Sequence, residues 1–209
     1  MRSEVLVRHY FLSAALLFSS LSLPVAPAAE PYVELPRSAW LAPGEKVEVA
    51  ALFSYGCRYC RELEPLLNSW VAQLPSDVNF TRVPAMAGGI WNIYGQLFLT
   101  LETLRVEPAV HAAVFEAIGS RQSLATPHEM ALFLAGHGVD KAVFLDTYQS
   151  FAVQAKVKEA IRKTSAFEVS GVPALVVNGK YRFDQSTGGA QGMLALAQEL
   201  IARERALRK

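Results

Sequence analysis

The chain has two cysteines, Cys57 and Cys60, and both fall within the segment "FSYGCRYCRELEP". A disulfide between them closes one of the shortest loops available, and in the chain-entropy model such a bridge stabilises a fold little. A cysteine at a helix N-terminus is instead chemically active, because unpaired N–H groups and the helix dipole favour the thiolate over the thiol. The spacing therefore indicates a reversible dithiol–disulfide pair rather than a structural staple.

The two cysteines are expected to have different roles. Cys57, at the helix start, is predicted to be the nucleophile and leaving group toward other proteins, and Cys60, one turn further along, the buried resolving thiol. Between them, Arg58 brings a permanent cation that should lower the pKa of the Cys57 thiol, whereas Tyr59 brings a hydroxyl without charge. Arg58 and Tyr59 are therefore expected to tune the strength and direction of the exchange.

A CxxC pair can also be half of a four-cysteine zinc site. The chain has no second pair, so such a site would need a symmetric dimer that shares one zinc, and this alternative stays open. His111, His128 and His137 show no ligand spacing and are expected to be surface or helix-packing residues. We predict no metal and no cofactor other than the redox-active disulfide.

The first 28 residues have the order of a secretory signal peptide. Arg2 and Arg8 precede an apolar run over residues 10–23, and Ala26-Pro27-Ala28 supplies the small residues of a cleavage site. The alternative is a membrane anchor, but the run of 14 residues is shorter than the roughly 20 that cross a bilayer. Export would place the cysteines in an oxidising compartment, where disulfides persist.

Charge and size limit the function classes. Residues 1–28 hold two arginines and one glutamate, so the formal net charge of +1 for the whole chain becomes zero for the remainder. That balance gives no indication of a nucleic-acid or anionic-membrane partner. The remainder, about 180 residues, is long enough for one domain with a sizeable core and an insertion.

The elements around the cysteines predict a parallel sheet. Residues 47–55 are short and apolar and indicate a buried strand, and an amphipathic helix with a possible kink at Pro65 follows from the cysteines onward. Residues 78–83 indicate a second strand. Strand, helix and strand in this order are typical of a βαβ unit.

Helical patterns then replace strand patterns until about residue 167. Thr126 and Glu129 form a capping box with Pro127 at the first helical position, and Asp140 starts another helix. After this insertion, residues 172–184 predict two strands joined at Asn178-Gly179, a strong hairpin signal. A closing helix is expected over residues 190–206.

These features together resemble the DsbA family of exported thiol-disulfide oxidoreductases. The resemblance rests on a strand ending in Phe53-Ser54, the CxxC at a helix start, the long helical insertion, Gly171-Val172-Pro173 and "VNGKY". It implies an α/β fold, a thioredoxin fold with an inserted α-helical domain. The expected boundaries are 1–28 for the signal peptide, 29–83 and 168–209 for the thioredoxin fold, and 84–167 for the insertion.

The resemblance also implies the roles of four further residues. Pro173 would be in a cis peptide bond facing the cysteines, so that Val172 presents its backbone to an extended client peptide; an ordinary trans proline is the alternative. Glu64 matches the family's buried acid and, at i+4 from Cys60, could take or return the proton of that thiol. An exposed surface glutamate is the alternative. Arg82 matches a basic position that can pair with the acid.

The chain departs from the family pattern at two positions. Ala51 stands where many members carry another acid, and Tyr59 replaces the histidine of the common CPHC sequence. Both changes affect the redox potential, and we expect a weaker oxidant than the strongest members unless Arg58 compensates.

The predicted function is that of a periplasmic, monomeric thiol-disulfide oxidoreductase that donates its Cys57–Cys60 disulfide to reduced exported proteins. The family implies reoxidation by a DsbB-type membrane quinone reductase. Two alternatives stay open: a thioredoxin-like reductase or specialised oxidase with few clients, and a non-enzymatic peptide-binding or metallochaperone module on the same fold.

Overall fold

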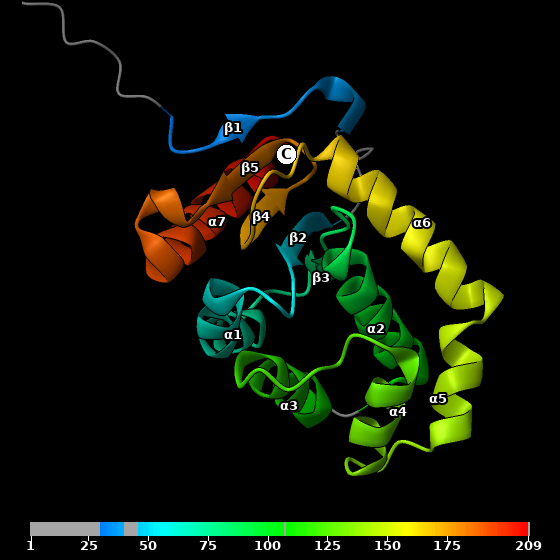
Figure 1. Cartoon of the computed structure of the whole chain (residues 1–209). Coiled ribbons are helices and arrows are strands. Elements are labelled where there is room, and N and C mark those ends of the chain that lie inside the picture. Colours follow the sequence, from blue (N-terminus) through cyan, green and yellow to red (C-terminus); the bar gives the residue numbers. More distant parts are fainter. Residues whose placement is uncertain (1–29, 40–45, 107, 209) are drawn as a thin grey trace, which may run out of the picture.

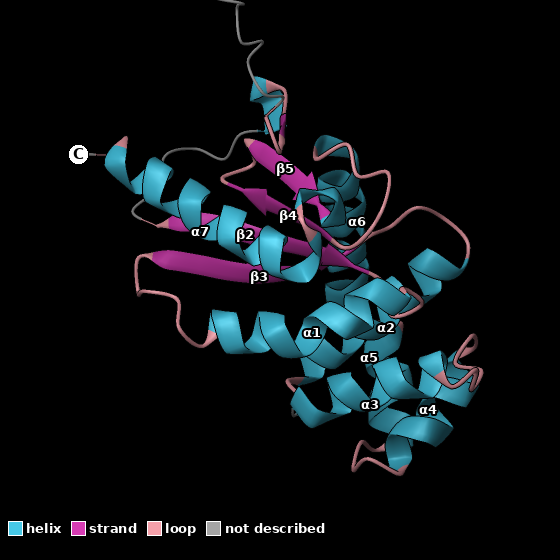
Figure 2. Ribbon diagram, turned by 90° about the vertical axis from the view of Figure 1, so that its left-hand side faces the viewer, coloured by secondary structure: helices cyan, strands magenta, loops and turns pink. Residues whose placement is uncertain are grey.

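The computed structural model describes residues 30–39, 46–106 and 108–208. The predicted signal peptide therefore lies outside the described residues. The described chain forms a five-stranded sheet with helices on both faces, and a group of helices extends beyond one edge of the sheet (Figure 1, Figure 2). Within the described residues, no helix combines the length and apolar character needed to cross a bilayer.

The sheet has the strand order β1-β5-β4-β2-β3. The pair at one edge, β2 and β3, is parallel, and all other neighbouring strands are antiparallel. The strands are β1 (Val33–Glu34), β2 (Val47–Phe53), β3 (Val78–Pro84), β4 (Ala174–Val177) and β5 (Tyr181–Asp184). The predicted parallel pair is confirmed, whereas β1 was not foreseen.

Helix α1 (Arg58–Val71) connects β2 to β3 and completes the predicted βαβ unit. Pro65 lies inside this helix, which continues for six residues beyond it. The apolar face of α1 places Leu63 and Leu67 against the sheet, where both are about 3% exposed. The polar face is left to solvent, as expected for an amphipathic helix.

The described residues between β3 and β4 form five helices, in the segment where the sequence predicts a helical insertion. They are α2 (Ile90–Leu104), α3 (Pro108–Gly119), α4 (Pro127–Ala135), α5 (Lys141–Tyr148) and α6 (Phe151–Ala166). The capping box at the start of α4 is present, because Thr126 Oγ1 accepts from Glu129 N–H and Glu129 accepts from Thr126 N–H. Asp140 caps α5 by accepting from Val143 N–H.

The chain returns to the sheet through the predicted hairpin. Asn178 and Gly179 have φ values of 51° and 67°, as a two-residue hairpin turn requires. Helix α7 (Gly189–Ala206) then packs on the sheet. It lies with α1 on one face, while α6 lies on the other (Figure 2).

Two clusters of buried side chains form the core. One joins α1 and α7 to the first face of the sheet; the other joins the opposite face to the inserted helices and contains Cys60, Leu52 and Phe53. The cysteines therefore lie where the two parts of the fold meet, and Figure 1 shows α1 between the sheet and α3.

Candidate active site

Cys57 and Cys60 are joined by a disulfide at the start of α1. Cys57 is the N-cap residue, and its Sγ accepts a hydrogen bond of 3.1 Å from the backbone N–H of Cys60. Cys60 is 2% exposed, whereas Cys57 is only half-buried. An incoming thiolate therefore reaches Cys57 more easily, and a thiolate released at Cys57 would keep a backbone donor.

The two residues between the cysteines point to solvent. Arg58 Nε donates to Glu62 Oε1 over 2.7 Å, one helical turn further along α1. Tyr59 is 56% exposed. Arg58 is thus paired with a carboxylate, which weakens the effect of the cation that the sequence places next to Cys57.

The segment before β4 faces the disulfide. The Val172–Pro173 peptide bond is cis, so the trans alternative is excluded. The carbonyl oxygen of Val172 lies 3.4 Å from Cys57 Sγ. A backbone acceptor therefore adjoins the more exposed of the two sulfurs, just before the start of β4.

Glu64 is buried on α1, with an exposed fraction of 8%, which excludes the surface alternative. Its Oε1 accepts from Arg82 Nε and Nη2, at 3.0 and 2.7 Å, and Arg82 Nη2 also donates to Asn68 Oδ1 at 2.6 Å. Burial opposes ionisation of this carboxyl, but His111 and Arg82 outweigh it and lower the pKa of Glu64. The carboxylate and guanidinium thus form a partly buried ion pair, and Glu64 lies one helical turn after Cys60 on α1.

His111 belongs to this group, which sequence reasoning did not foresee. It lies on α3, and its Nε2 is 3.4 Å from Glu64 Oε1 while its Nδ1 is 2.7 Å from Tyr55 Oη. The prediction of a surface or helix-packing residue was therefore incomplete. The available signal was a single histidine within the apolar pattern of residues 108–119, with Tyr55 two residues before Cys57.

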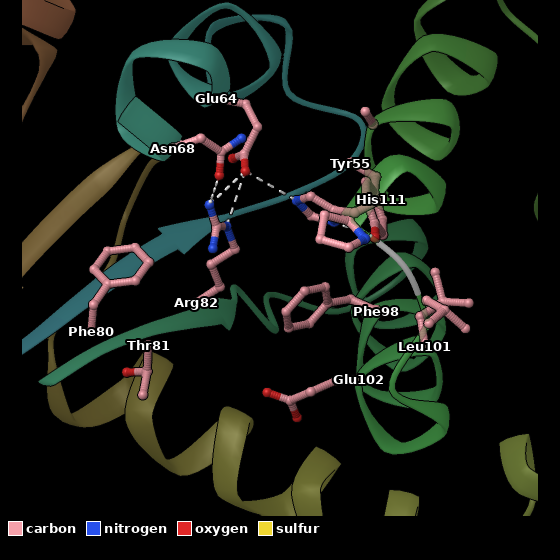
Figure 3. A pocket seen from close by; sticks show the side chains of 13 residues that line it. Tyr55, Glu64, Asn68, Phe80, Thr81, Arg82, Phe98, Leu101, Glu102 and His111 are labelled. Atoms are coloured by element: carbon pink, nitrogen blue, oxygen red, sulfur yellow. Dashed lines mark hydrogen bonds and ion pairs between the residues drawn. The ribbon is translucent and has the colours of Figure 1, made fainter. Parts of the chain in front are cut away.

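The same residues line a cavity of about 400 Å³ between α1, β3, α2 and α3. Figure 3 shows Glu64 and Arg82 pointing toward each other in its wall, with His111 and Tyr55 side by side next to them. No group of three side chains suited to hold a metal ion is found among the described residues.

Ala51 occupies the position at which the sequence comparison with the family expects a second acid. It pairs with Arg82 in the register of β2 and β3 and is 4% exposed. Because paired residues of neighbouring strands project to the same face, an acid at position 51 would lie beside Arg82. Ala51 supplies no carboxylate at this position, next to the pair formed by Arg82 and Glu64.

Comparisons with known proteins agree with this geometry. The family model "DSBA-like thioredoxin domain" matches residues 92–200. "Thiol:disulfide interchange protein DsbA" of Azotobacter vinelandii is 54% identical over 176 residues, covering 83% of this chain and 82% of the relative. The protein of the same name from Pseudomonas aeruginosa is 49% identical over 210 residues, covering 97% of this chain and all of the relative.

Solved structures give the same result. The crystal structure of Pseudomonas aeruginosa DsbA matches with a TM-score of 0.82 and 52% identity, covering 85% of this chain and 94% of that one. DsbA from Xylella fastidiosa matches with a TM-score of 0.78 and 33% identity, covering 88% and 99%. The chain has the thioredoxin fold with an inserted helical domain, and it belongs to the DsbA family of thiol:disulfide oxidoreductases.

Proposed function

We propose that this enzyme is a periplasmic oxidase, active as a monomer, that passes its Cys57–Cys60 disulfide to reduced exported proteins. The difference in exposure between the half-buried Cys57 and the buried Cys60 carries this proposal. A client thiolate attacks Cys57 Sγ, the intramolecular S–S bond breaks, and Cys60 leaves as a thiolate that takes up a proton. A second client thiolate then attacks the client sulfur of the mixed disulfide and releases Cys57 as a thiolate, so the client loses two electrons and the enzyme gains them.

The other site residues have supporting roles in this scheme. The carbonyl of Val172 and the cis Pro173 hold the extended client backbone beside Cys57, which their position next to the disulfide supports. Glu64, tuned by Arg82, exchanges the proton of Cys60, four residues earlier on the same helix. Arg58 and Tyr59 set the strength of the oxidant.

The proposal also covers the processing of the chain, its domain boundaries and its reoxidation. Residues 1–28 are a cleaved signal peptide, residues 84–167 form the inserted domain between the thioredoxin segments 29–83 and 168–209, and a DsbB-type quinone reductase restores the disulfide. No further cofactor takes part.

The equilibrium with glutathione tests the direction. We expect the reduction potential of the Cys57–Cys60 pair to lie well above the thioredoxin value of about −270 mV and below the strong-oxidant value of about −120 mV. The lower bound follows from the place of Cys57 at the start of α1, where a thiolate accepts from the backbone N–H of Cys60. The upper bound follows from the absence of a histidine before Cys60 and from the pairing of Arg58 with Glu62. A potential near the thioredoxin value would contradict the oxidase direction.

A trapping experiment tests the exchange itself. Cys60→Ser removes the resolving thiol, so mixed disulfides between Cys57 and exported proteins should accumulate and be visible on non-reducing gels. The matched variant Cys57→Ser should trap far fewer, because the remaining thiol is buried. Equal trapping by both variants would contradict the assigned roles.

The reductase direction remains the second candidate because of one observation. Arg58 is ion-paired with Glu62, and Tyr59 carries no charge, so the disulfide has less cationic support than its sequence indicates. A weakly supported thiolate favours the oxidised enzyme and a lower potential. The glutathione equilibrium distinguishes the two directions.

A further inference from the structure

The inference concerns His111, a half-buried residue whose two ring nitrogens have different contacts. Its Nδ1 lies 2.7 Å from Tyr55 Oη, and its Nε2 lies 3.4 Å from Glu64 Oε1. Nε2 is buried and makes no well-formed hydrogen bond within the described residues. Buried polar atoms without a full partner are uncommon in folded proteins and call for an explanation.

Tyr55 determines which nitrogen of the ring carries the proton. Burial, and then the negative charge of Glu64, raise the pKa of Tyr55 well above its ordinary value, so the phenol keeps its proton. A protonated phenol can donate to Nδ1, and we assign this direction because it leaves the ring proton for Nε2, which lies 3.4 Å from Glu64 Oε1. In the neutral imidazole the ring proton then sits on Nε2, the nitrogen that faces Glu64.

Among the described residues, Glu64 is the one acidic group at ion-pair distance from Nε2–H. Four aromatic rings pack around the imidazole, those of Phe53, Tyr55, Phe98 and Phe115, with centroids 5.1 to 5.6 Å away. The charged groups that line the adjoining cavity are Glu64 of α1, Arg82 of β3 and Glu102 of α2, and Lys156 neutralises Glu102. In these apolar surroundings an N–H pointing at a carboxylate interacts more strongly than it would in water.

A second contact holds α3 against α1. Arg61 Nη1 lies 3.6 Å from Glu116 Oε2, and a Cβ at Gly119 would collide with the Arg61 guanidinium. The side chain of Arg61 thus lies over the end of α3. Figure 3 shows His111 of α3 pointing toward Glu64 of α1.

We propose that His111 is the positioning residue for Glu64: its Nε2–H, oriented by Tyr55, holds the carboxylate against Arg82, so that the inserted domain completes the charged group that Glu64 forms with Arg82. The inference rests on the proposed role of Glu64 in exchanging the proton of Cys60. It assigns to the inserted domain a direct part in the redox centre, in addition to packing.

The test replaces His111 in the full-length protein and follows Glu64 directly. Carboxyl carbons of the glutamates are labelled with ¹³C, and the pH titration of Glu64 is recorded by NMR, with Glu64→Gln identifying its signal. In His111→Phe, a ring that suits the aromatic surroundings, the proton affinity of Glu64 should rise about tenfold because a donor is lost. His111→Gln, which keeps an N–H donor, should give a smaller rise.

Two further variants separate positioning from a general loss of structure. The double variant Tyr55→Phe, His111→Phe leaves no unpartnered hydroxyl in the aromatic group and should show the same tenfold change as His111→Phe while remaining folded. His128→Phe changes an exposed histidine of α4 and should leave Glu64 unchanged. An unchanged titration of Glu64 in both His111→Phe and the double variant would overturn the inference.

A second readout separates this inference from the proposed function. Protonation of Glu64 removes a negative charge behind the cysteines, so in the pH range between the old and new titrations the Cys57 thiolate should form more readily. The ultraviolet absorbance of the thiolate in the reduced enzyme measures this. If the titration of Glu64 shifts while that of Cys57 does not, the positioning role of His111 is supported, and the charge of Glu64 does not act on Cys57.

Discussion

The charge next to Cys57 depends on where the Arg58 side chain points. A guanidinium aimed at the helix start would add to the unpaired N–H groups and favour the thiolate. In this protein it binds Glu62 instead, and both side chains are largely exposed. Solvent screens such a pair, so the effect on the thiol is modest but of definite sign.

Removing the partner should therefore strengthen the oxidant. In Glu62→Gln, the pKa of the Cys57 thiol should fall, and the equilibrium with glutathione should shift roughly twofold to fivefold toward the reduced enzyme. Arg58→Met should shift it in the opposite direction, and added salt should reduce both effects. Glu159→Gln, which breaks a similar exposed pair with Arg162 on α6, is the control. An unchanged equilibrium in both Glu62→Gln and Arg58→Met would show that Arg58 does not tune the site.

At the scale of elements, a second buried acid, Glu204, links α7 to the hairpin between β4 and β5 by hydrogen bonds. Glu204, in the last turn of α7, is 3% exposed and accepts from Asn178 Nδ2, from Lys180 Nζ at 2.8 Å and from Tyr181 Oη at 3.2 Å. Burial opposes ionisation, but these donors outweigh it and lower the pKa of Glu204. Unlike Glu64, this acid is remote from the disulfide, so it should affect stability alone.

Glu204→Gln should destabilise the fold by about 2 kcal/mol at neutral pH, because hydrogen bonds to a charged acceptor are lost. A carboxyl with a lowered folded-state pKa contributes stability above its unfolded pKa of about 4.3, and this contribution disappears as pH falls through the folded value. Urea unfolding at a series of pH values should thus show the native and variant proteins converging in acid. The glutathione equilibrium should not move; if it did, the two buried acids would not be independent.

Sequence patterns predicted those elements whose signals are local. The βαβ unit, the Asn178-Gly179 hairpin and the Thr126 cap each depend on residues close together in the chain, and all three are present. Strand β1 has two residues, too few for any periodicity, and it exists because β5 offers it a free edge. His111 and Tyr55 are 56 residues apart, and only the docking of α3 on α1 brings them together.

At the scale of the whole molecule, the inserted helices and the sheet share one core. The cluster that contains Leu52 and Phe53 of β2 also contains Leu134 of α4 and Phe144 of α5, and both of these are fully buried. Gln96 Nε2 additionally donates to the carbonyl of Tyr148, which links α2 to the end of α5. A continuous core of this kind should make the inserted helices and the sheet unfold together.

Leu134→Ala tests this cooperativity from the side remote from the disulfide. Loss of a fully buried leucine should cost about 3 kcal/mol. If the core is continuous, calorimetry should show one transition at a lower temperature, with equal calorimetric and van't Hoff enthalpies. Leu132→Ala, two residues away on the same helix and 49% exposed, should barely change it. Two separate transitions in Leu134→Ala would mean that the helices unfold independently, and the link between α3 and the redox centre would then be lost before the sheet unfolds.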